Sequence, residues 1–361
     1  MLNTDRGTFS ILLLISCILI GAVLKIASSV LLPIAIAVLL AFAMYPIVIW
    51  LEKHKIPHIV SIILVVIAII FILLVFIIVL FSMGLNIISI YQRYEPRITE
   101  IYSWVAQIFY LPYDESLSFF ENLWRQLGIR TWIRNFTFSF SNIFVSFLVS
   151  AILVVIFTLF ILLEASHFKL KLGAAFNNRA EHISRIGRDL MAQITRFLTA
   201  KFFISIATGV TIGIGLWAIR LEYAIGWGLI AFMFNFIPNL GSIAAGVLTS
   251  LFALLQFWPN PVPIVLVVAL ILAVNIFIGI ILDPKIVGDH VGLSPLVVLI
   301  SLALWGYIWG FAGMLLSVPM TVIIKIICEN YPLLEPISYL IGSKKSVNAK
   351  KAEQATNHFH D

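Results

Sequence analysis

Asparagine, proline and glycine residues interrupt the apolar sequence between Phe234 and Ser242, which reads FNFIPNLGS. In hydrocarbon an unpaired backbone group costs several kcal/mol, so a broken helix persists only where protein or water receives the freed groups. The amides of Asn235 and Asn239 can hydrogen-bond such groups or a polar solute. We therefore expect a site at this break, with solute contacts from Asn235, Pro238, Asn239 and Gly241.

A second interruption, DPKIVGD at Asp283–Asp289, carries ionisable side chains. Such groups at the edge of a membrane core are costly unless they are paired or hydrated. One interpretation is purely structural, because a proline after Asp283 ends a helix at a polar boundary. The other is that the segment lines a solute or ion path, with gate or coupling roles for Asp283, Pro284, Lys285 and Asp289.

A third break packs glycines and aromatic residues into GYIWGFAG, between Gly306 and Gly313. It divides the apolar segment 293–327 much as FNFIPNLGS divides the segment 224–257. Two interrupted segments in corresponding positions point to a binding site at the membrane midplane in secondary transporters. The remaining expected solute contacts are Asn275, in the middle of the run Ile264–Leu282, together with Gly306 and Gly310.

The amino-acid composition indicates whether the helices that carry these residues lie in water or in lipid. Of the 361 residues, 61% are hydrophobic and 11% are charged, and the mean hydropathy is +1.09. Soluble domains carry about 25% charged residues, and a membrane helix needs about 20 apolar residues. The sequence thus predicts an all-α polytopic membrane protein with six to eight transmembrane helices. The net charge of +6 is explained by basic cytoplasmic loops rather than by nucleic-acid binding.

The order of apolar and charged stretches predicts five regions. They are three N-terminal transmembrane helices (1–85), a charged helical extramembrane lobe (86–140), a fourth span with a basic amphipathic cytoplasmic helix (141–201), a transport core with broken helices (202–330) and a cytoplasmic tail (331–361). The core segments 224–257 and 293–327 fit either kinked spans or re-entrant hairpins. Six or eight spans both return the C-terminus to the cytoplasmic side, where the basic linker also places the N-terminus.

Enzymatic chemistry has no support in the sequence. No GxxxxGK[ST], HExxH or GxSxG motif is present. The two cysteines, Cys17 and Cys328, lie in apolar runs far from each other and from any histidine cluster. We expect no catalytic residues, no metal site and no cofactor.

The broken segments resemble the autoinducer-2 exporter family of bacterial membrane permeases. The resemblance lies in FNFIPNLGS and in DPKIVGDHVGLSPLVVLISLALWGYIWGFAGMLLSVPM, and it extends over nearly the whole hydropathy layout. It implies a multi-pass permease of the bacterial inner membrane that forms a homo-oligomer. The family is named for export of the quorum-sensing signal autoinducer-2, and some members resemble sodium(lithium)/proton antiporters.

These observations predict a secondary transporter that moves a small polar solute by alternating access around the two broken units. Autoinducer-2 is one expected solute, and sodium or a proton is the expected coupling ion. The protein is expected to lie in a lipid bilayer. A monovalent-cation/proton antiporter is an alternative, which requires a protonatable carboxylate at depth. A non-transporting membrane scaffold is a second alternative, although an anchor has no need of broken helices.

Overall fold

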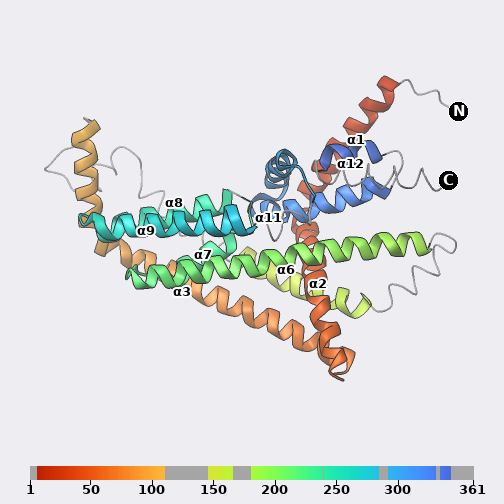
Figure 1. Cartoon of the computed structure of the whole chain (residues 1–361), viewed down its shortest axis with the longest axis horizontal. Helices are drawn as coiled ribbons and strands as arrows, with labels where there is room; N and C mark the ends of the chain where they lie inside the picture. Colours follow the sequence, from red (N-terminus) through yellow and green to blue (C-terminus); the bar gives the residue numbers. More distant parts are fainter. Residues whose placement is uncertain are drawn as a thin grey trace. The chain divides into compact units, whose positions relative to one another are not determined.

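The computed structural model describes residues 6–109, 145–165, 180–238, 240–283, 292–330 and 334–342. Within these ranges the regular elements are helices, apart from one isolated bridge between Leu293 and Gly342. The all-α prediction is confirmed. The helices are α1 (Arg6–Ile26), α2 (Ser28–Lys53), α3 (His58–Phe109), the Val145–Ala165 helix, α6 (Ala180–Ala218), α7 (Ala224–Phe234), α8 (Leu240–Phe257), α9 (Pro261–Val274), the π-helix η2 (Asn275–Leu282), α11 (Pro295–Asn330) and α12 (Glu335–Ile341) (Figure 1).

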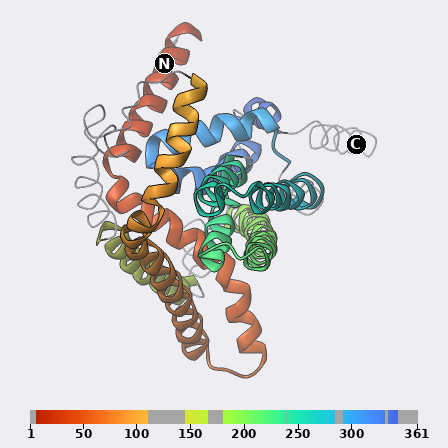
Figure 2. The ribbon, with the colours of Figure 1, turned by 90° about the vertical axis from the view of Figure 1, so that its left-hand side faces the viewer.

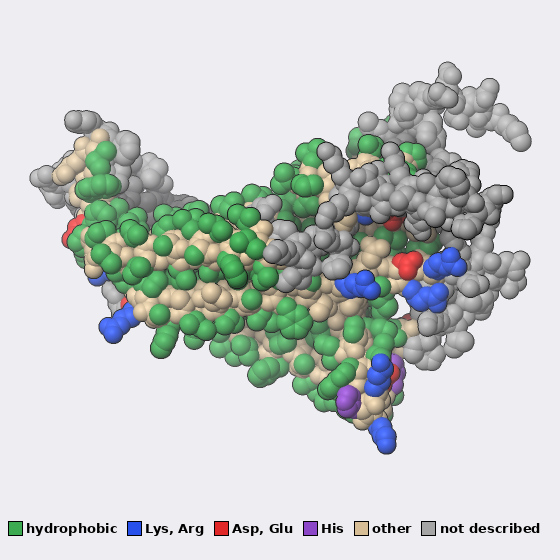
Figure 3. Space-filling view, viewed as in Figure 1, with side chains coloured by type: hydrophobic (Ala, Val, Ile, Leu, Met, Phe, Trp, Pro, Cys, Tyr) green, Lys and Arg blue, Asp and Glu red, His purple; other side chains and the backbone are tan. Residues whose placement is uncertain are grey.

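Seven helices in the described part of the chain are long and apolar enough to cross a membrane. Large apolar side chains on their surfaces are well exposed, for example Phe71 on α3 and Ile280 on η2, at 65% and 69%. In Figure 3 hydrophobic side chains cover α8 and α9 along their lengths, and charged side chains gather near the helix ends. An apolar surface of this extent is stable in lipid and not in water. The chain is therefore a polytopic membrane protein.

The chain divides into two compact units built from interleaved segments. The first unit contains Met1–Ala68, Ser150–Ala200 and Ile286–Asp361, and the second contains Ile69–Val149 and Lys201–Lys285. Of the expected lobe, residues 86–109 continue α3 as helix, whereas residues 110–140 lie outside the described residues. The tail beyond residue 342 also lies outside them.

The core of the first unit is built around α11. Its buried residues pack with Leu39 of α2 and with Ile194 and Phe197 of α6. Of the 18 most apolar consecutive residues of α11, 56% are buried, whereas the corresponding share in the Val145–Ala165 helix is 17%. A helix covered to this extent lies inside the protein, whereas the Val145–Ala165 helix has the exposure of a lipid-facing span.

α11 is a helical hairpin that turns at Trp309 and Gly310. These two residues leave the helical conformation, and Gly310 has φ 62° and ψ −143°, a backbone region open only to glycine. The hydroxyl of Ser301 donates to the carbonyl of Ser317 at 2.9 Å. In one straight helix these residues would stand about 24 Å apart, so the chain folds back on itself. The first limb runs to the turn and the second limb returns from it.

The end of α1 contacts the turn of this hairpin. The indole nitrogen of Trp309 donates to the carbonyl of Leu24 at 3.0 Å. The ammonium of Lys25 lies 3.5 Å from the centre of the Tyr307 ring, which is a cation–π contact. Both interactions hold the turn against α1.

The second unit contains a second hairpin, formed by α7 and α8. Phe252 near the end of α8 lies 6.2 Å and 5.3 Å, ring centre to ring centre, from Tyr223 and Trp227 at the start of α7. The two helices are therefore antiparallel and the chain reverses between Asn235 and Leu240. Both interrupted segments are thus helical hairpins in the structure rather than single kinked helices. Figure 2 looks along the helices and shows α6, α7, α8 and α9 grouped together.

Small residues bring α6 and α7 into backbone contact. A Cβ added to Gly228 would lie 2.6 Å from the carbonyl oxygen of Gly209 and 3.0 Å from the Cα of Gly213. Gly209 and Gly213 form a small-xxx-small pattern, which allows membrane helices to approach closely. This packing fixes α7, and with it the turn of the hairpin, on one face of α6.

Candidate functional site

One face of α6 carries buried polar side chains in the middle of an apolar span. Lys201, Ser205 and Thr208 are 4%, 0% and 3% exposed, and their spacing places them on the same side of the helix. Thr208 is satisfied locally, because its hydroxyl donates to the carbonyl of Ile204 at 2.9 Å. Lys201 and Ser205 instead bond to other elements, so this face joins parts of the chain that are distant in sequence.

Lys201 forms a buried ion pair with Asp283. Its ammonium nitrogen Nζ lies 2.7 Å from Oδ2 of the carboxylate, and the two side chains are 4% and 24% exposed. Oδ1 of Asp283 is buried and has no hydrogen-bond partner within the described residues. Removing one member of such a pair leaves an uncompensated buried charge. The spare oxygen can accept a proton, a cation or a hydrogen-bond donor of a solute.

Asn235 at the turn of the α7–α8 hairpin bonds to the same face of α6. Its amide nitrogen Nδ2 donates to the hydroxyl of Ser205 at 3.0 Å, and both side chains are buried. Ser205 follows Lys201 by one helical turn. The structure therefore brings together two residues that the sequence singled out separately, Asn235 and Asp283, through two residues of α6.

Gly241 and Pro238 shape the turn itself. A Cβ on Gly241 would lie 1.7 Å from the carbonyl oxygen of Phe234, so no side chain fits there. The carbonyl of Pro238 accepts a hydrogen bond from the amide of Leu240 at 2.6 Å. Both residues allow α8 to begin directly against the end of α7. Asn239 lies outside the described residues.

Asn275 begins the π-helix η2, which ends at Leu282, directly before Asp283. Its side chain is half-buried, and its amide nitrogen lies 3.9 Å from the position of a Cβ on Gly246 of α8. π-helical segments are rare and frequently occur at functional sites, because the wider turn displaces side chains from their α-helical positions. The predicted gate residues after Asp283, namely Pro284, Lys285 and Asp289, lie outside the described residues.

The first unit contains a separate polar cluster in the α11 hairpin. Lys325, 6% exposed, donates to the carbonyl of Gly292 at 3.0 Å and lies 4.0 Å from the carboxylate of Glu329. One to two turns before it, the hydroxyls of Thr321 and Ser317 both bond within the hairpin. The other two predicted contacts belong to the turn region: Gly310 forms the turn, and Gly306 packs against Met314.

The sequence did not point to Lys201, to Ser205, or to the carbonyl of Gly292 that accepts from Lys325. Lys201 was assigned to the basic linker that indicates topology, although it begins a helical face that continues with Ser205 and Thr208. A search for polar residues at spacings of three and four inside apolar spans would have found that face. Among the described residues no group of three or more His, Cys, Asp or Glu side chains could hold a metal ion.

Known proteins match almost the entire chain. The AI-2E family transporter model matches residues 13–333. A Borreliella burgdorferi protein with only a general transport name is 31% identical over 353 residues, which cover 95% of each chain. AI-2 transport protein TqsA of Escherichia coli (strain K12) is 28% identical over 342 residues, 94% of this chain and 97% of the relative.

A third relative is described by a different cargo. The sodium-lithium/proton antiporter of Halobacillus andaensis is 31% identical over 180 residues, 50% of this chain and 49% of the relative. The apolar spans and hairpins of the structure fit a membrane transporter, as does the match to the family over residues 13–333. The chain therefore belongs to the AI-2E family of membrane transporters.

Proposed function

We propose that this chain is a secondary transporter of a small polar solute, which works by alternating access around its two helical hairpins. The observation that carries the proposal is the buried Lys201–Asp283 pair beside the turn of the α7–α8 hairpin. Ionisable groups inside a membrane protein are costly and mark ion or substrate pathways. We expect residues at the two turns and at the start of η2 to contact the solute, namely Asn235, Pro238, Asn239, Gly241, Asn275, Gly306 and Gly310.

The ion pair suggests how transport is coupled to an ion gradient. When a proton or cation binds the carboxylate of Asp283, the ammonium of Lys201 loses its counter-charge. A buried cation without a partner is unstable, so Lys201 must reach water or an acceptor on the solute. Ion binding and a rearrangement of α6 against η2 would thereby be linked. Lys285 and Asp289, with Pro284 between Asp283 and Lys285, would complete the gate.

Autoinducer-2 is the cargo that we propose first. The support is the Escherichia coli relative, which matches this chain along nearly its full length and is named as an AI-2 transport protein. A small polar solute suits the amides of Asn235 and Asn239, because an amide both donates and accepts hydrogen bonds.

A monovalent-cation/proton antiporter is the second candidate. The specific observation in its favour is Oδ1 of Asp283, which has no hydrogen-bond partner among the described residues and is an oxygen ligand of the kind that small hard cations prefer. The Halobacillus andaensis relative adds support over half of the chain. In this mode sodium or lithium and a proton would compete for one carboxylate, and no organic solute would be needed.

Flux measurements in proteoliposomes separate the two proposals. One set holds autoinducer-2 and the other a pH-sensitive dye, each with and without imposed proton and sodium gradients. Gradient-driven autoinducer-2 flux that falls about tenfold in Asn235→Ala supports the first, since one lost hydrogen bond costs up to about 1.5 kcal/mol. Sodium-dependent proton movement that is lost in Asp283→Asn supports the second.

Glu100→Gln is the matched control, because this exposed carboxylate lies on α3 outside the polar face of α6. It should leave either flux unchanged. Absence of both fluxes from correctly inserted protein would contradict both proposals and favour the scaffold interpretation. Normal flux in Asp283→Asn would exclude the proposed coupling role of that carboxylate.

A further inference from the structure

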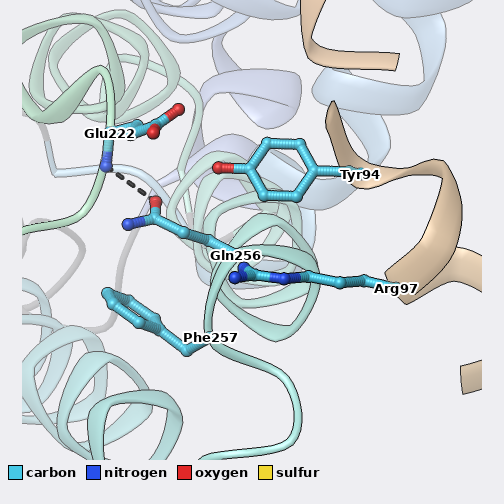
Figure 4. Close-up of a pocket in the computed structure, with 5 residues that line it drawn as sticks. All are labelled: Tyr94, Arg97, Glu222, Gln256 and Phe257. Carbon is cyan, nitrogen blue, oxygen red and sulfur yellow. Dashed lines mark hydrogen bonds between the residues drawn. The ribbon is translucent and has the colours of Figure 1, made fainter. Parts of the chain in front are cut away.

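A polar cavity lies at the end of the second unit's helices where α6 finishes and α7 begins. It has a volume of about 330 Å³ and is lined by Tyr94, Arg97, Glu222, Gln256 and Phe257. Figure 4 shows Tyr94 and Arg97 reaching in from α3, with Glu222, Gln256 and Phe257 facing them. No residue of this cavity belongs to the site described above.

The wall that carries Gln256 is rigidly built. The amide oxygen of Gln256 accepts from the backbone N–H of Glu222 at 2.7 Å, and its amide nitrogen donates to the carbonyl of Arg220 at 2.9 Å. These two bonds tie the end of α8 to the segment between α6 and α7. Tyr94, 2% exposed, packs edge-on against Phe252 of α8 and thereby holds α3 in place. The walls therefore hold their shape without a ligand.

Arg97 brings a cationic group to this cavity. Its guanidinium lies 5.6 Å from the centre of the Tyr94 ring, a weak cation–π contact. It forms no hydrogen bond or ion pair with any other residue that the structure describes. A guanidinium presents five N–H donors in a planar fork that matches a carboxylate. Such a group at a cavity wall is ready to bind an anion.

Glu222 places the opposite charge on the facing wall of the same cavity. A ligand with a negative group alone would meet the guanidinium but would also meet this carboxylate. A ligand with both charges is attracted at both ends, and the aromatic rings of Tyr94 and Phe257 cover its apolar part. A volume near 330 Å³ is at the small end of ligand pockets.

We propose that this cavity is a binding site for a small zwitterion of amino-acid size, with its carboxylate on Arg97 and its ammonium on Glu222. The site is distinct from the Lys201–Asp283 pair, because the stretch of α6 from Lys201 to Ala218 is about 26 Å long. Exposed Trp104 and half-buried Trp258, whose tilted rings lie 5.6 Å apart near this end, are typical of a membrane–water boundary. The cavity thus faces a water-accessible side and does not depend on the proposed transport.

The test is equilibrium binding to the full-length protein in lipid nanodiscs with three matched probes: L-alanine, acetate and methylammonium. Acetate and methylammonium each carry one of the two charges. L-Alanine is expected to bind at least about tenfold more tightly than either single-charge probe, since each charge-assisted hydrogen bond adds that much. Arg97→Gln and Glu222→Gln should each weaken L-alanine binding by a similar factor.

Arg97→Lys keeps the positive charge but lacks the planar set of N–H donors. It should weaken L-alanine binding less than Arg97→Gln does. Exposed residues outside the cavity serve as controls, and Arg188→Gln and Glu100→Gln should leave binding unchanged. Thermal unfolding confirms that each variant is folded. Equal binding of acetate and L-alanine, binding that survives Arg97→Gln, or no binding of L-alanine by folded protein would overturn the proposal. None of these outcomes bears on the flux measurements.

Discussion

Lys201 and Lys325 show what a membrane helix requires in order to contain a buried cation. Each ammonium faces an oxygen from a distant part of its own unit, Oδ2 of Asp283 in one case and the carbonyl of Gly292 in the other. Burying an isolated charge is far too costly. The partner oxygen is therefore as necessary for the fold as the lysine itself, and neither residue can be interpreted alone.

At the residue scale, a set of substitutions separates the structural role of the Lys201–Asp283 pair from its proposed coupling role. Lys201→Met and Asp283→Asn should each lower the free energy of unfolding by about 3–5 kcal/mol, since each leaves one buried group without its partner. The double variant Lys201→Met/Asp283→Leu should recover most of that loss. Equilibrium unfolding in mixed detergent micelles measures all three.

Lys53→Met is the control, because Lys53 is exposed at the end of α2. It should change the unfolding free energy by less than about 0.5 kcal/mol. If both single variants were as stable as the control, the ion pair would contribute nothing to stability. If the stable double variant still showed gradient-driven flux, the pair would not couple transport.

At the element scale, both hairpins turn where glycine removes a steric obstacle. Gly310 adopts a backbone conformation that other residues avoid, and Gly241 leaves no room for a Cβ beside the carbonyl of Phe234. Chain reversal then places the limbs in contact, and hydroxyl groups such as those of Ser301 and Thr321 meet between them. The interrupted sequences are thus turns of compact hairpins.

A cysteine pair tests the reversal in α11. Ser301→Cys/Thr321→Cys, made with Cys17→Ala and Cys328→Ala, should form an intramolecular disulfide under mild oxidation, because the two hydroxyls are in contact. In a continuous helix these positions would be about 30 Å apart, which no disulfide can span. Loss of maleimide labelling, followed by mass spectrometry, reports the bond.

Ser301→Cys/Ile324→Cys is the matched control for the cysteine pair. Ile324 lies on the same limb as Thr321 but is 41% exposed, so its side chain points away from the interface between the limbs. This pair should keep both thiols available for labelling. Equal oxidation of the two pairs would mean that the limbs are not packed in the observed register, and no oxidation of either would favour a straight span.

At the scale of the whole molecule, the α7–α8 hairpin determines which side of the membrane the following loop occupies. Glu222, just before α7, and Phe257, at the end of α8, line one cavity, so the hairpin starts and ends at the same place. If both hairpins are re-entrant, five of the seven long apolar helices remain as crossings: α2, α3, the Val145–Ala165 helix, α6, and α9 with η2. We expect α1, an apolar helix of 21 residues, to be the sixth. The even number of crossings returns the C-terminus to the side of the N-terminus.

Cysteine accessibility in intact cells measures this topology. In the background without native cysteines, Arg220→Cys and Pro261→Cys should react with a membrane-impermeant maleimide from the same, periplasmic side. Lys53→Cys should react only after the membrane is opened, because the basic loop near it indicates the cytoplasm. Labelling of Pro261→Cys from the side of Lys53 would show that α7 and α8 cross the membrane as one kinked span.

The membrane class, the helical content and the breaks at FNFIPNLGS and GYIWGFAG were predictable from the sequence. Hydropathy and helix-breaking residues are local properties, so runs such as Val60–Leu85 and breaks such as FNFIPNLGS can be recognised without any tertiary contact. The family resemblance was also correct, because motifs at the breaks are contiguous stretches of sequence.

Only the tertiary structure decided between kinks and hairpins, and only it paired Lys201 with Asp283 and Asn235 with Ser205. The first pair is separated by 82 positions and the second by 30. Hydropathy does not record which helices become neighbours, because any apolar surface is equally satisfied by lipid. The neighbours are selected by close approach at Gly209 and Gly228 and by the need of each buried polar group for a partner. Those requirements are met in three dimensions, and they determine where the buried polar groups of this protein meet.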